Sequence, residues 1–314
     1  MTLNDTVIQY VAFRKSMGEE FDSAASLLKT FCRRMGGDIE LADITAEHVQ
    51  AFLVGTGPLS GYCRRKYDVL RGLYRYAISR GLVNHAPLPS TVPQAPRFEP
   101  YIYTEDEVRR LLTGCASCLN PPRKLEPHTL RAILLLLYGA GLRIGEAVAL
   151  TVADVDVPDA VITIRNTKFH KTRLVPLGPQ LNQVIAHYAT CREAAGHSTD
   201  GEASFFVLRR GAATSVPIIE CAFRRLCRHV GVYRNDGARY QPRLHDLRHG
   251  FAVNRLTSWY RQGADVQKLL PLLATYMGHV KLSATQVYLT MTPELLHEAS
   301  LRFEQYACQG VRHD

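Results

Sequence analysis

The pattern of apolar and polar positions predicts an all-helical segment over residues 1–92. Apolar residues recur there every three or four positions, the spacing that places them on one face of a helix. The clearest repeat consists of Phe21, Ala24, Leu27, Leu28 and Phe31. Gly36 ends that helix, Thr45 and Ser60 are placed to begin the next two, and Gly81 closes the last. With a further helix near the start of the chain, the pattern predicts a small domain of four helices.

A proline-rich stretch follows this segment. Residues 86–100 contain five prolines. Proline has a fixed φ and no backbone N–H, so the stretch is neither a helix nor a central strand. We therefore predict an extended linker over residues 93–100 and a second domain over residues 101–314, with the boundary near residue 98.

The second domain combines helical patterns with a few short runs of β-branched residues. Thr104 and Glu107 form a capping-box pattern, and His128 to Tyr138 is an apolar run of helical length. Three antiparallel strands are predicted, Val152 to Val157, Val161 to Arg165 and Arg173 to Leu177. Helical patterns occupy most of the remainder. The predicted fold class is mainly α with a small antiparallel sheet, an α+β arrangement.

Composition narrows the choice of partner. The chain has 314 residues, of which 46% are hydrophobic, so it can bury two ordinary cores. Its net charge of +9 indicates nucleic acid first and an anionic membrane surface second, although a basic protein without either partner has the same balance. The polar start carries no export signal, and eight irregularly spaced cysteines suit a reducing interior. We expect a cytoplasmic protein.

The predicted fourth helix is unusually basic. Its cations are Arg64, Arg65, Lys66, Arg71 and Arg75, and four tyrosines are interleaved with them. Such a helix can lie along a phosphate backbone and neutralise its charge. Alternatively, the tyrosines face the core and the cations form a solvated surface. The sequence leaves both interpretations open and favours DNA contact.

Candidate chemistry gathers in the second domain. His245 and Arg248 are three residues apart and share one face of a helix, and His279 follows in a Gly-His turn. Tyr288 comes nine positions later, and Arg143 stands upstream at a helix start, with Glu146 one turn on. Guanidiniums, imidazoles and a phenol together suit a phosphodiester. Cys115 and Cys118 could bind zinc, with His128 nearby, but no second cysteine pair lies at ribbon spacing, so the sequence does not favour a metal site.

The ordered set resembles the tyrosine site-specific recombinases, the family of phage integrases and Xer recombinases. The resemblance is strongest from about residue 101 to residue 290. Six residues fall on the family's catalytic positions, in order: Arg143, Lys168, His245, Arg248, His279 and Tyr288. The resemblance implies a SAM-like four-helix core-binding domain that clamps DNA, followed by a catalytic domain. It also implies that neither metal nor ATP is required.

The resemblance assigns a role to each residue. Tyr288 attacks the phosphodiester and forms a 3′-phosphotyrosine, while the two arginines and His279 bind the phosphate. His245 handles the tyrosine proton, and Lys168 protonates the leaving 5′ oxygen. Glu146 holds Arg143 or another cation. Tyr276 is a rival nucleophile and Lys171 a rival acid, and the order of residues favours Tyr288 and Lys168.

The resemblance also predicts a place at the nucleoid of a bacterial cytoplasm, and partners. They are duplex DNA with specific sites, a homotetramer joined through the amphipathic tail from Pro293 to Ala307, and accessory recombinases. The run from Leu269 to His279 is similar to recombinases carried on transposable elements, so we expect a mobile-element integrase. Two alternatives remain: a catalytically silent DNA-binding accessory protein, and an enzyme similar to type IB topoisomerases.

Overall fold

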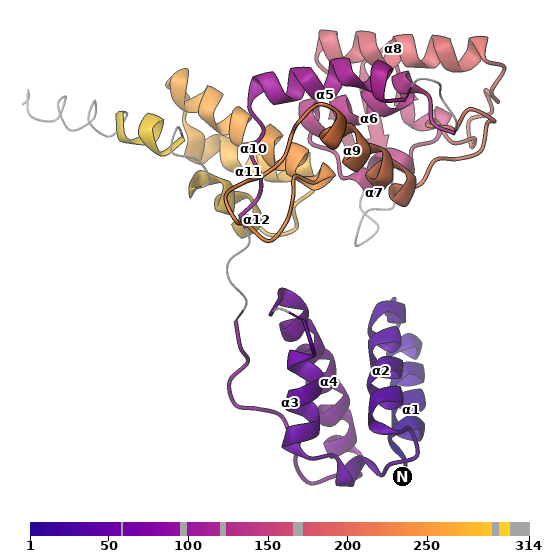
Figure 1. The fold of residues 1–314 in the computed structure, drawn as a ribbon, viewed down its shortest axis with the longest axis vertical. Coiled ribbons are helices and arrows are strands. Elements are labelled where there is room, and N and C mark those ends of the chain that lie inside the picture. The colour runs from indigo at the N-terminus through magenta and orange to yellow at the C-terminus, as the bar shows by residue number, and fades with distance from the viewer. Residues whose placement is uncertain (58, 95–98, 120–123, 166–171, 291–294, 302–314) are drawn as a thin grey trace, which may run out of the picture. The chain divides into compact units, whose positions relative to one another are not determined.

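The computed structural model describes the whole chain except residues 58, 95–98, 120–123, 166–171, 291–294 and 302–314. The chain divides into two compact units, Met1–Phe98 and Glu99–Asp314 (Figure 1). The predicted linker at 93–100 lies partly outside the described residues. Among the described residues, no helix is both long and apolar enough to span a membrane.

The first unit contains the four predicted helices. They are α1 (Leu3–Ser16), α2 (Asp22–Met35), α3 (Ala46–Val54) and α4 (Gly61–Ser79), with a short 3₁₀ helix η1 (Leu41–Asp43) before α3. The Thr45 hydroxyl accepts a hydrogen bond from the His48 N–H and begins α3, and the Ser60 hydroxyl accepts one from the Tyr62 N–H and begins α4. Gly36 ends α2 in the left-handed conformation, as the sequence predicted.

The core of the first unit lies between these helices. Phe31 of α2 packs against Phe52 of α3, with ring centroids 4.8 Å apart, and Leu70 of α4 is fully buried. Residues beyond α4, including Leu88 and Val92, pack against the same core. The unit therefore extends past its last helix through the first part of the proline-rich stretch.

The second unit is built around α6, which packs against α5, α8 and α10. Its helices are α5 (Glu105–Cys118), α6 (Pro127–Gly139), α7 (Ile144–Val148), α8 (Pro179–Ala194), α9 (Val216–His229), α10 (Leu244–Arg261), α11 (Val266–Met277) and α12 (Ser283–Gln286), and a 3₁₀ turn η3 (Val287–Thr290) follows. Thr104 and Glu107 form the predicted capping box at the start of α5. Leu130 and Ile133 of α6 have no exposed surface, which explains the unbroken apolar pattern of this helix.

Three antiparallel strands form the sheet, in the order β1 (Val155–Asp156), β2 (Val161–Ile164) and β3 (Arg173–Pro176). The fold class predicted from the sequence is confirmed, but the first strand is shorter than predicted. Residues Val152–Asp154 form a 3₁₀ turn, η2, because the Asp154 carboxylate accepts hydrogen bonds from both the backbone N–H and the hydroxyl of Thr151. Side-chain capping thus overrides the β-branched pattern at this point.

A second, smaller core holds the end of the unit together. Phe251 and Leu256 of α10 pack with Leu273 and Met277 of α11. Leu295 and Tyr288 of η3 are buried in the same cluster, although Tyr288 carries a polar hydroxyl. The η3 turn is therefore fixed against α10 by apolar packing, which determines where the Tyr288 hydroxyl lies.

Candidate active site

Arg143 is the N-cap residue of α7, directly after a glycine turn. Its Nη1 lies 2.7 Å from Oε1 of Glu146, and its backbone N–H donates to Oε2 at 2.9 Å. Its Nη2 donates to the carbonyl of Gly278 at 2.9 Å. The predicted pairing of Glu146 with Arg143 is present, and it orients the guanidinium from two sides.

A third guanidinium, which the sequence reasoning missed, shares the same carboxylate. Arg173 of β3 donates from Nη1 and Nη2 to the two oxygens of Glu146, at 3.0 and 2.8 Å, and its Nε donates to the carbonyl of Tyr276 at 3.0 Å. Burial alone would raise the pKa of the Glu146 carboxyl, but hydrogen bonds from Arg173 and Arg143 hold this pKa at about 2. The carboxylate is therefore charged at neutral pH.

Arg248 is buried, with 1% of its surface exposed. Its Nη2 donates to the carbonyl of Met277 at 2.6 Å, and its Nη1 donates to the carbonyl of Gly141. Burial lowers the pKa of the Arg248 guanidinium to about 10, so the group stays charged at neutral pH. The site thus holds a desolvated, fixed positive charge, which suits an anionic ligand.

Gly141 supplies the turn that presents its carbonyl to Arg248. Its φ is +63°, and a Cβ placed there would lie 2.4 Å from the ring of Phe251. Both the left-handed backbone and the close approach of α10 require glycine at this position. The glycine turn before Arg143 therefore also positions Arg248, through the carbonyl of Gly141.

The three arginines bind three successive carbonyls at the end of α11. Arg173 donates to the backbone carbonyl of Tyr276, Arg248 to that of Met277, and Arg143 to that of Gly278. These carbonyls lack helical partners at a C-terminus and carry the negative end of the helix dipole. The turn that leads to His279 is in this way tied to α7, β3 and α10 at once.

Tyr288 lies beside these arginines with 3% of its surface exposed. Its hydroxyl oxygen lies 3.1 Å from Nδ1 of His249, and its ring stacks on the ring of His279, with centroids 6.1 Å apart. Burial raises the pKa of the Tyr288 phenol, while the charges of Arg248 and Arg143 oppose the rise. The structure therefore brings the predicted nucleophile together with both predicted arginines and with His279.

His279 follows Gly278, which ends α11 in the left-handed conformation. Its Nδ1 lies 2.7 Å from the hydroxyl oxygen of Thr285, a residue with no exposed surface. Burial, together with the charges of Arg248 and Arg143, lowers the pKa of His279 to about 4. The ring is neutral at physiological pH, and Thr285 fixes its orientation.

His245 and His249 occupy successive turns of α10, with perpendicular rings and centroids 4.7 Å apart. Burial and the neighbouring arginines lower the pKa of His245. The imidazole within hydrogen-bonding distance of the Tyr288 hydroxyl is that of His249, a residue that the sequence reasoning did not select. The motif H-D-L-R-H at 245–249 could have indicated His249, because His245 and His249 are four residues apart and share a face of the helix.

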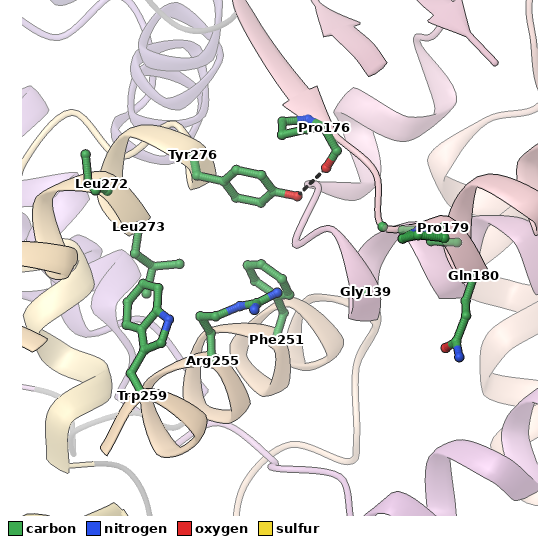
Figure 2. Close-up of a pocket in the computed structure, with 12 residues that line it drawn as sticks. Gly139, Pro176, Pro179, Gln180, Phe251, Arg255, Trp259, Leu272, Leu273 and Tyr276 are labelled. Carbon is green, nitrogen blue, oxygen red and sulfur yellow. Dashed lines mark hydrogen bonds between the residues drawn. The ribbon is translucent and has the colours of Figure 1, made fainter. Parts of the chain in front are cut away.

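The rival nucleophile Tyr276 is directed elsewhere. Its hydroxyl donates to the carbonyl of Pro176 at 3.3 Å, and its ring stacks on Phe251, with centroids 5.7 Å apart (Figure 2). It lines an apolar cavity of about 730 Å³, together with Arg255 and Trp259. Its side chain therefore serves packing between α11, α10 and the end of β3.

Lys168 and Lys171 lie outside the described residues. The strands on either side of their loop are described, and Ile164 of β2 pairs with Arg173 of β3. Because Arg173 binds Glu146, this end of the hairpin adjoins the site. The role of Lys168 as the acid stays a prediction.

The basic residues of α4 divide into two groups. One group is exposed and consists of Arg64, Arg65, Arg71 and Arg75. Asp68 forms ion pairs with Arg64 and Arg71. Lys66 is half-buried, and its ammonium donates to the carbonyl of Phe52 at 2.7 Å, at the end of α3. Burial lowers the pKa of Lys66. The structure thus gives Lys66 a role inside the unit that the sequence did not predict.

Cys115 is a core residue. Its thiol donates to the carbonyl of Leu111 at 3.3 Å, and burial raises its pKa to about 12. Within the described ranges, no group of three or more His, Cys, Asp or Glu side chains could hold a metal ion. The alternative of a zinc site at Cys115 and Cys118 finds no support there.

A helical unit with a small sheet and a buried cluster of arginines, imidazoles and one phenol is typical of enzymes that attack DNA phosphodiesters through a tyrosine. Residues 102–294 match the model of the phage integrase family. The chain is 35% identical to the putative integrase/recombinase y4rE of Sinorhizobium fredii, across 96% of this chain and 95% of that protein. It is 33% identical to the tyrosine recombinase XerD of Mycobacterium tuberculosis, across 83% of each. The chain belongs to the phage integrase family of tyrosine recombinases.

A solved structure with the same fold is that of the Tn1549 transposon integrase in complex with transposon right end DNA. The TM-score is 0.73 at 17% sequence identity, and the match covers 98% of this chain and 100% of that chain. At this identity the likeness concerns the fold. The match covers residues of both units of the chain.

Proposed function

We propose that this protein is a site-specific DNA recombinase that cleaves and rejoins duplex DNA through a 3′-phosphotyrosyl intermediate at Tyr288. The observation that carries the proposal is the buried Tyr288 hydroxyl, which lies next to His249 and in the field of Arg248 and Arg143. The family to which the chain belongs supports the same reaction class. Because the phosphotyrosyl bond retains the energy of the cleaved bond, the reaction needs neither ATP nor metal.

The arginines supply transition-state stabilisation. In phosphoryl transfer the negative charge spreads over the non-bridging oxygens, so fixed donors in a dry site lower the barrier. Arg248 and Arg143 are held by Met277, Gly141 and Gly278, so neither guanidinium has to reorganise when the phosphate arrives. His279, neutral and oriented by Thr285, adds one further hydrogen bond.

The leaving 5′ oxygen needs a proton, and Lys168 is the proposed general acid. A general acid contributes about a hundred- to ten-thousand-fold in rate. Lys168 belongs to the segment between β2 and β3, and β3 begins at Arg173, which binds Glu146. This anchoring supports delivery of the lysine to the scissile phosphate when DNA is bound.

DNA affinity comes in part from α4 of the first unit, which we propose to be a SAM-like core-binding domain over residues 1–92. Arg64, Arg65, Arg71 and Arg75 are exposed on this helix, and together they can neutralise several phosphates. We propose that the protein acts at the nucleoid of the bacterial cytoplasm, where duplex DNA is found. The proposed host is a mobile element, in which the recombinase integrates or transposes DNA.

Exchanging both strands of two duplexes requires four cleavages, so we propose a homotetramer on DNA, to which accessory recombinases can contribute subunits. The tail from residue 293 is the proposed contact between neighbours. Its described part, residues 295–301, is helical and buries Leu295 in its own unit while exposing Leu296 and Leu301. Deleting residues 293–314 is expected to weaken assembly more than binding to a single site, and an equal loss of both would argue against the tail as the contact.

Covalent trapping tests the proposal. The protein is incubated with a library of nicked duplexes whose central sequence is randomised, and adducts are separated on denaturing gels and sequenced. An adduct that forms with the wild type and is absent with Tyr288→Phe supports the nucleophile and the reaction class together. Tight binding without an adduct would instead indicate a silent accessory protein. Relaxation of plasmids that lack the recovered sequence would indicate a topoisomerase-like enzyme.

A further inference from the structure

The Tyr288 hydroxyl has an imidazole partner that is not among the six family positions. His249 stands on the second turn of α10, and its Nδ1 lies 3.1 Å from the Tyr288 oxygen. The two ring centroids are 5.5 Å apart at an interplanar angle of 56°, a tilted arrangement in which Nδ1 is the atom that meets the hydroxyl. This geometry is that of a hydrogen bond between a nucleophile and its base.

His249 lies in contact with two other rings of the site. His245 packs perpendicular to it at 4.7 Å, and Tyr288 lies on another side. His245, His249 and Arg248 come from the same stretch of α10, and apolar packing of Phe251 and Leu256 holds that helix against η3. The separation between Nδ1 and the phenol is thus set by the core and not by exposed side chains.

We propose that His249 takes the phenolic proton of Tyr288 during strand cleavage and returns it during rejoining. The inference rests on the proposed function and assigns to His249 the step that the family resemblance gives to His245. In cleavage, the bond from the Tyr288 oxygen to phosphorus forms and the bond from phosphorus to the 5′ oxygen breaks. The phenolic proton moves to Nδ1 of His249, and the 5′ oxygen takes a proton from the general acid. Rejoining reverses each transfer.

The surroundings keep the acceptor nitrogen available. The groups that face His249 are His245 and Arg248 from α10, Arg243 at the N-cap of that helix, His279 from the turn after α11, and Tyr288 from η3. Burial, followed by the charges of these neighbours, lowers the pKa of His249 to about 3. The ring is therefore neutral before DNA binds, and with its hydrogen on Nε2 it presents a lone pair to the hydroxyl.

The arriving phosphate supplies the charge that makes the transfer favourable. An anionic phosphorane next to His249 stabilises the imidazolium that forms, because an opposite charge within a few ångströms favours the protonated form. The transfer is thereby linked to substrate, and Tyr288 stays a neutral phenol in the free protein. A nucleophile that ionises only against bound DNA does not react elsewhere.

The decisive comparison uses two variants of His249 and two forms of a nicked duplex recovered by covalent trapping. His249→Asn keeps an oxygen or nitrogen near the position of Nδ1 but cannot take up a proton, and His249→Phe keeps only the ring volume. The second duplex carries sulfur in place of the bridging 5′ oxygen, and sulfur leaves without protonation. We expect both variants to slow adduct formation by about a hundredfold or more, equally on the oxygen and sulfur duplexes.

Control variants distinguish proton transfer by His249 from general effects of a histidine substitution and from the role of Lys168. His187→Asn, an exposed histidine of α8, is expected to react as the wild type does. Lys168→Ala is expected to recover on the sulfur duplex, because the missing acid is then not needed. Near-ultraviolet circular dichroism and melting temperature establish that each variant is folded. Binding of uncleaved DNA is expected to stay within a few-fold of wild type for both His249 variants.

Each alternative outcome overturns a distinct claim. If His249→Asn reacts at the wild-type rate while His249→Phe is slow, His249 only positions the hydroxyl and the proton goes elsewhere. Recovery of His249→Asn on the sulfur duplex would assign the histidine to the leaving group. Wild-type rates in both variants, with Tyr288→Phe inactive, would defeat the inference and leave the proposed function intact. An adduct that persists in Tyr288→Phe would defeat both.

Discussion

Arg173 and Glu146 form a bidentate pair: Nη1 of Arg173 donates to Oε1 of Glu146 at 3.0 Å, and Nη2 donates to Oε2 at 2.8 Å. Each side chain is 11% exposed, so the pair is largely desolvated. The same carboxylate also binds Arg143, one of the two arginines proposed to bind the phosphate. One buried anion therefore fixes a catalytic cation and the strand that leads into the Lys168 hairpin.

Glu146→Gln is expected to destabilise the second unit. The substitution removes the charge that balances two guanidiniums, and breaking a buried ion pair costs about 3–5 kcal/mol. Urea denaturation measures the loss. Glu298→Gln is the matched control, because Glu298 pairs with the exposed Arg261, and surface pairs contribute about 0–1 kcal/mol. Equal effects of the two substitutions would show that Glu146 does not carry the buried network.

The sequence predicted the helices and the order of the site residues, because periodicity and local motifs specify them. It did not identify Arg173, whose partner Glu146 lies 27 residues away and is reached only when β3 packs beside α7. It selected His245 and not His249, because spacing shows which residues share a face and not which one reaches Tyr288. These contacts depend on tertiary packing, which a single sequence pattern does not specify.

The depressed pKa of Glu146 predicts an acid-dependent loss of stability. Its carboxyl has a pKa of about 2 in the folded protein and an ordinary value of 4.5. The contribution is therefore fully present above pH 4.5 and is lost as the pH falls toward 2. The shift corresponds to about 3 kcal/mol. Unfolding of wild type and Glu146→Gln between pH 7 and pH 3 is expected to show a difference that shrinks with acid; a constant difference would contradict it.

Arg248→Lys is expected to lower the rate of adduct formation by about a hundred- to a thousandfold. Lysine offers a single point charge and cannot bind the carbonyls of Gly141 and Met277 in the same planar fork. Burial also favours the neutral amine. Adduct formation on the recovered duplex measures the effect. Arg255→Lys, an exposed position on the same helix, is expected to be unaffected, and a similar loss there would indicate a general disturbance of α10.

Thr285→Val is expected to slow cleavage by about five- to tenfold. The substitution keeps the buried volume but removes the hydroxyl that orients His279 at 2.7 Å, and a neutral hydrogen bond contributes about 1 kcal/mol. Thr285→Ser retains the hydroxyl and is expected to keep most of the activity. Rates of adduct formation at saturating DNA distinguish the two. If serine were as slow as valine, the methyl group and not the hydrogen bond would be what matters.

The two kinds of cation on α4 predict two different phenotypes. Arg75 is exposed, so Arg75→Ala is expected to weaken DNA binding and to reduce the salt slope by about one, the amount for one lost phosphate contact. Lys66 binds the carbonyl of Phe52 at the end of α3, so Lys66→Ala is expected to cost about 1.5–3 kcal/mol of stability instead. Affinity as a function of salt, measured beside urea denaturation, separates the effects. A reduced salt slope in Lys66→Ala, with stability unchanged, would place its ammonium on DNA and contradict the role assigned to it within the first unit.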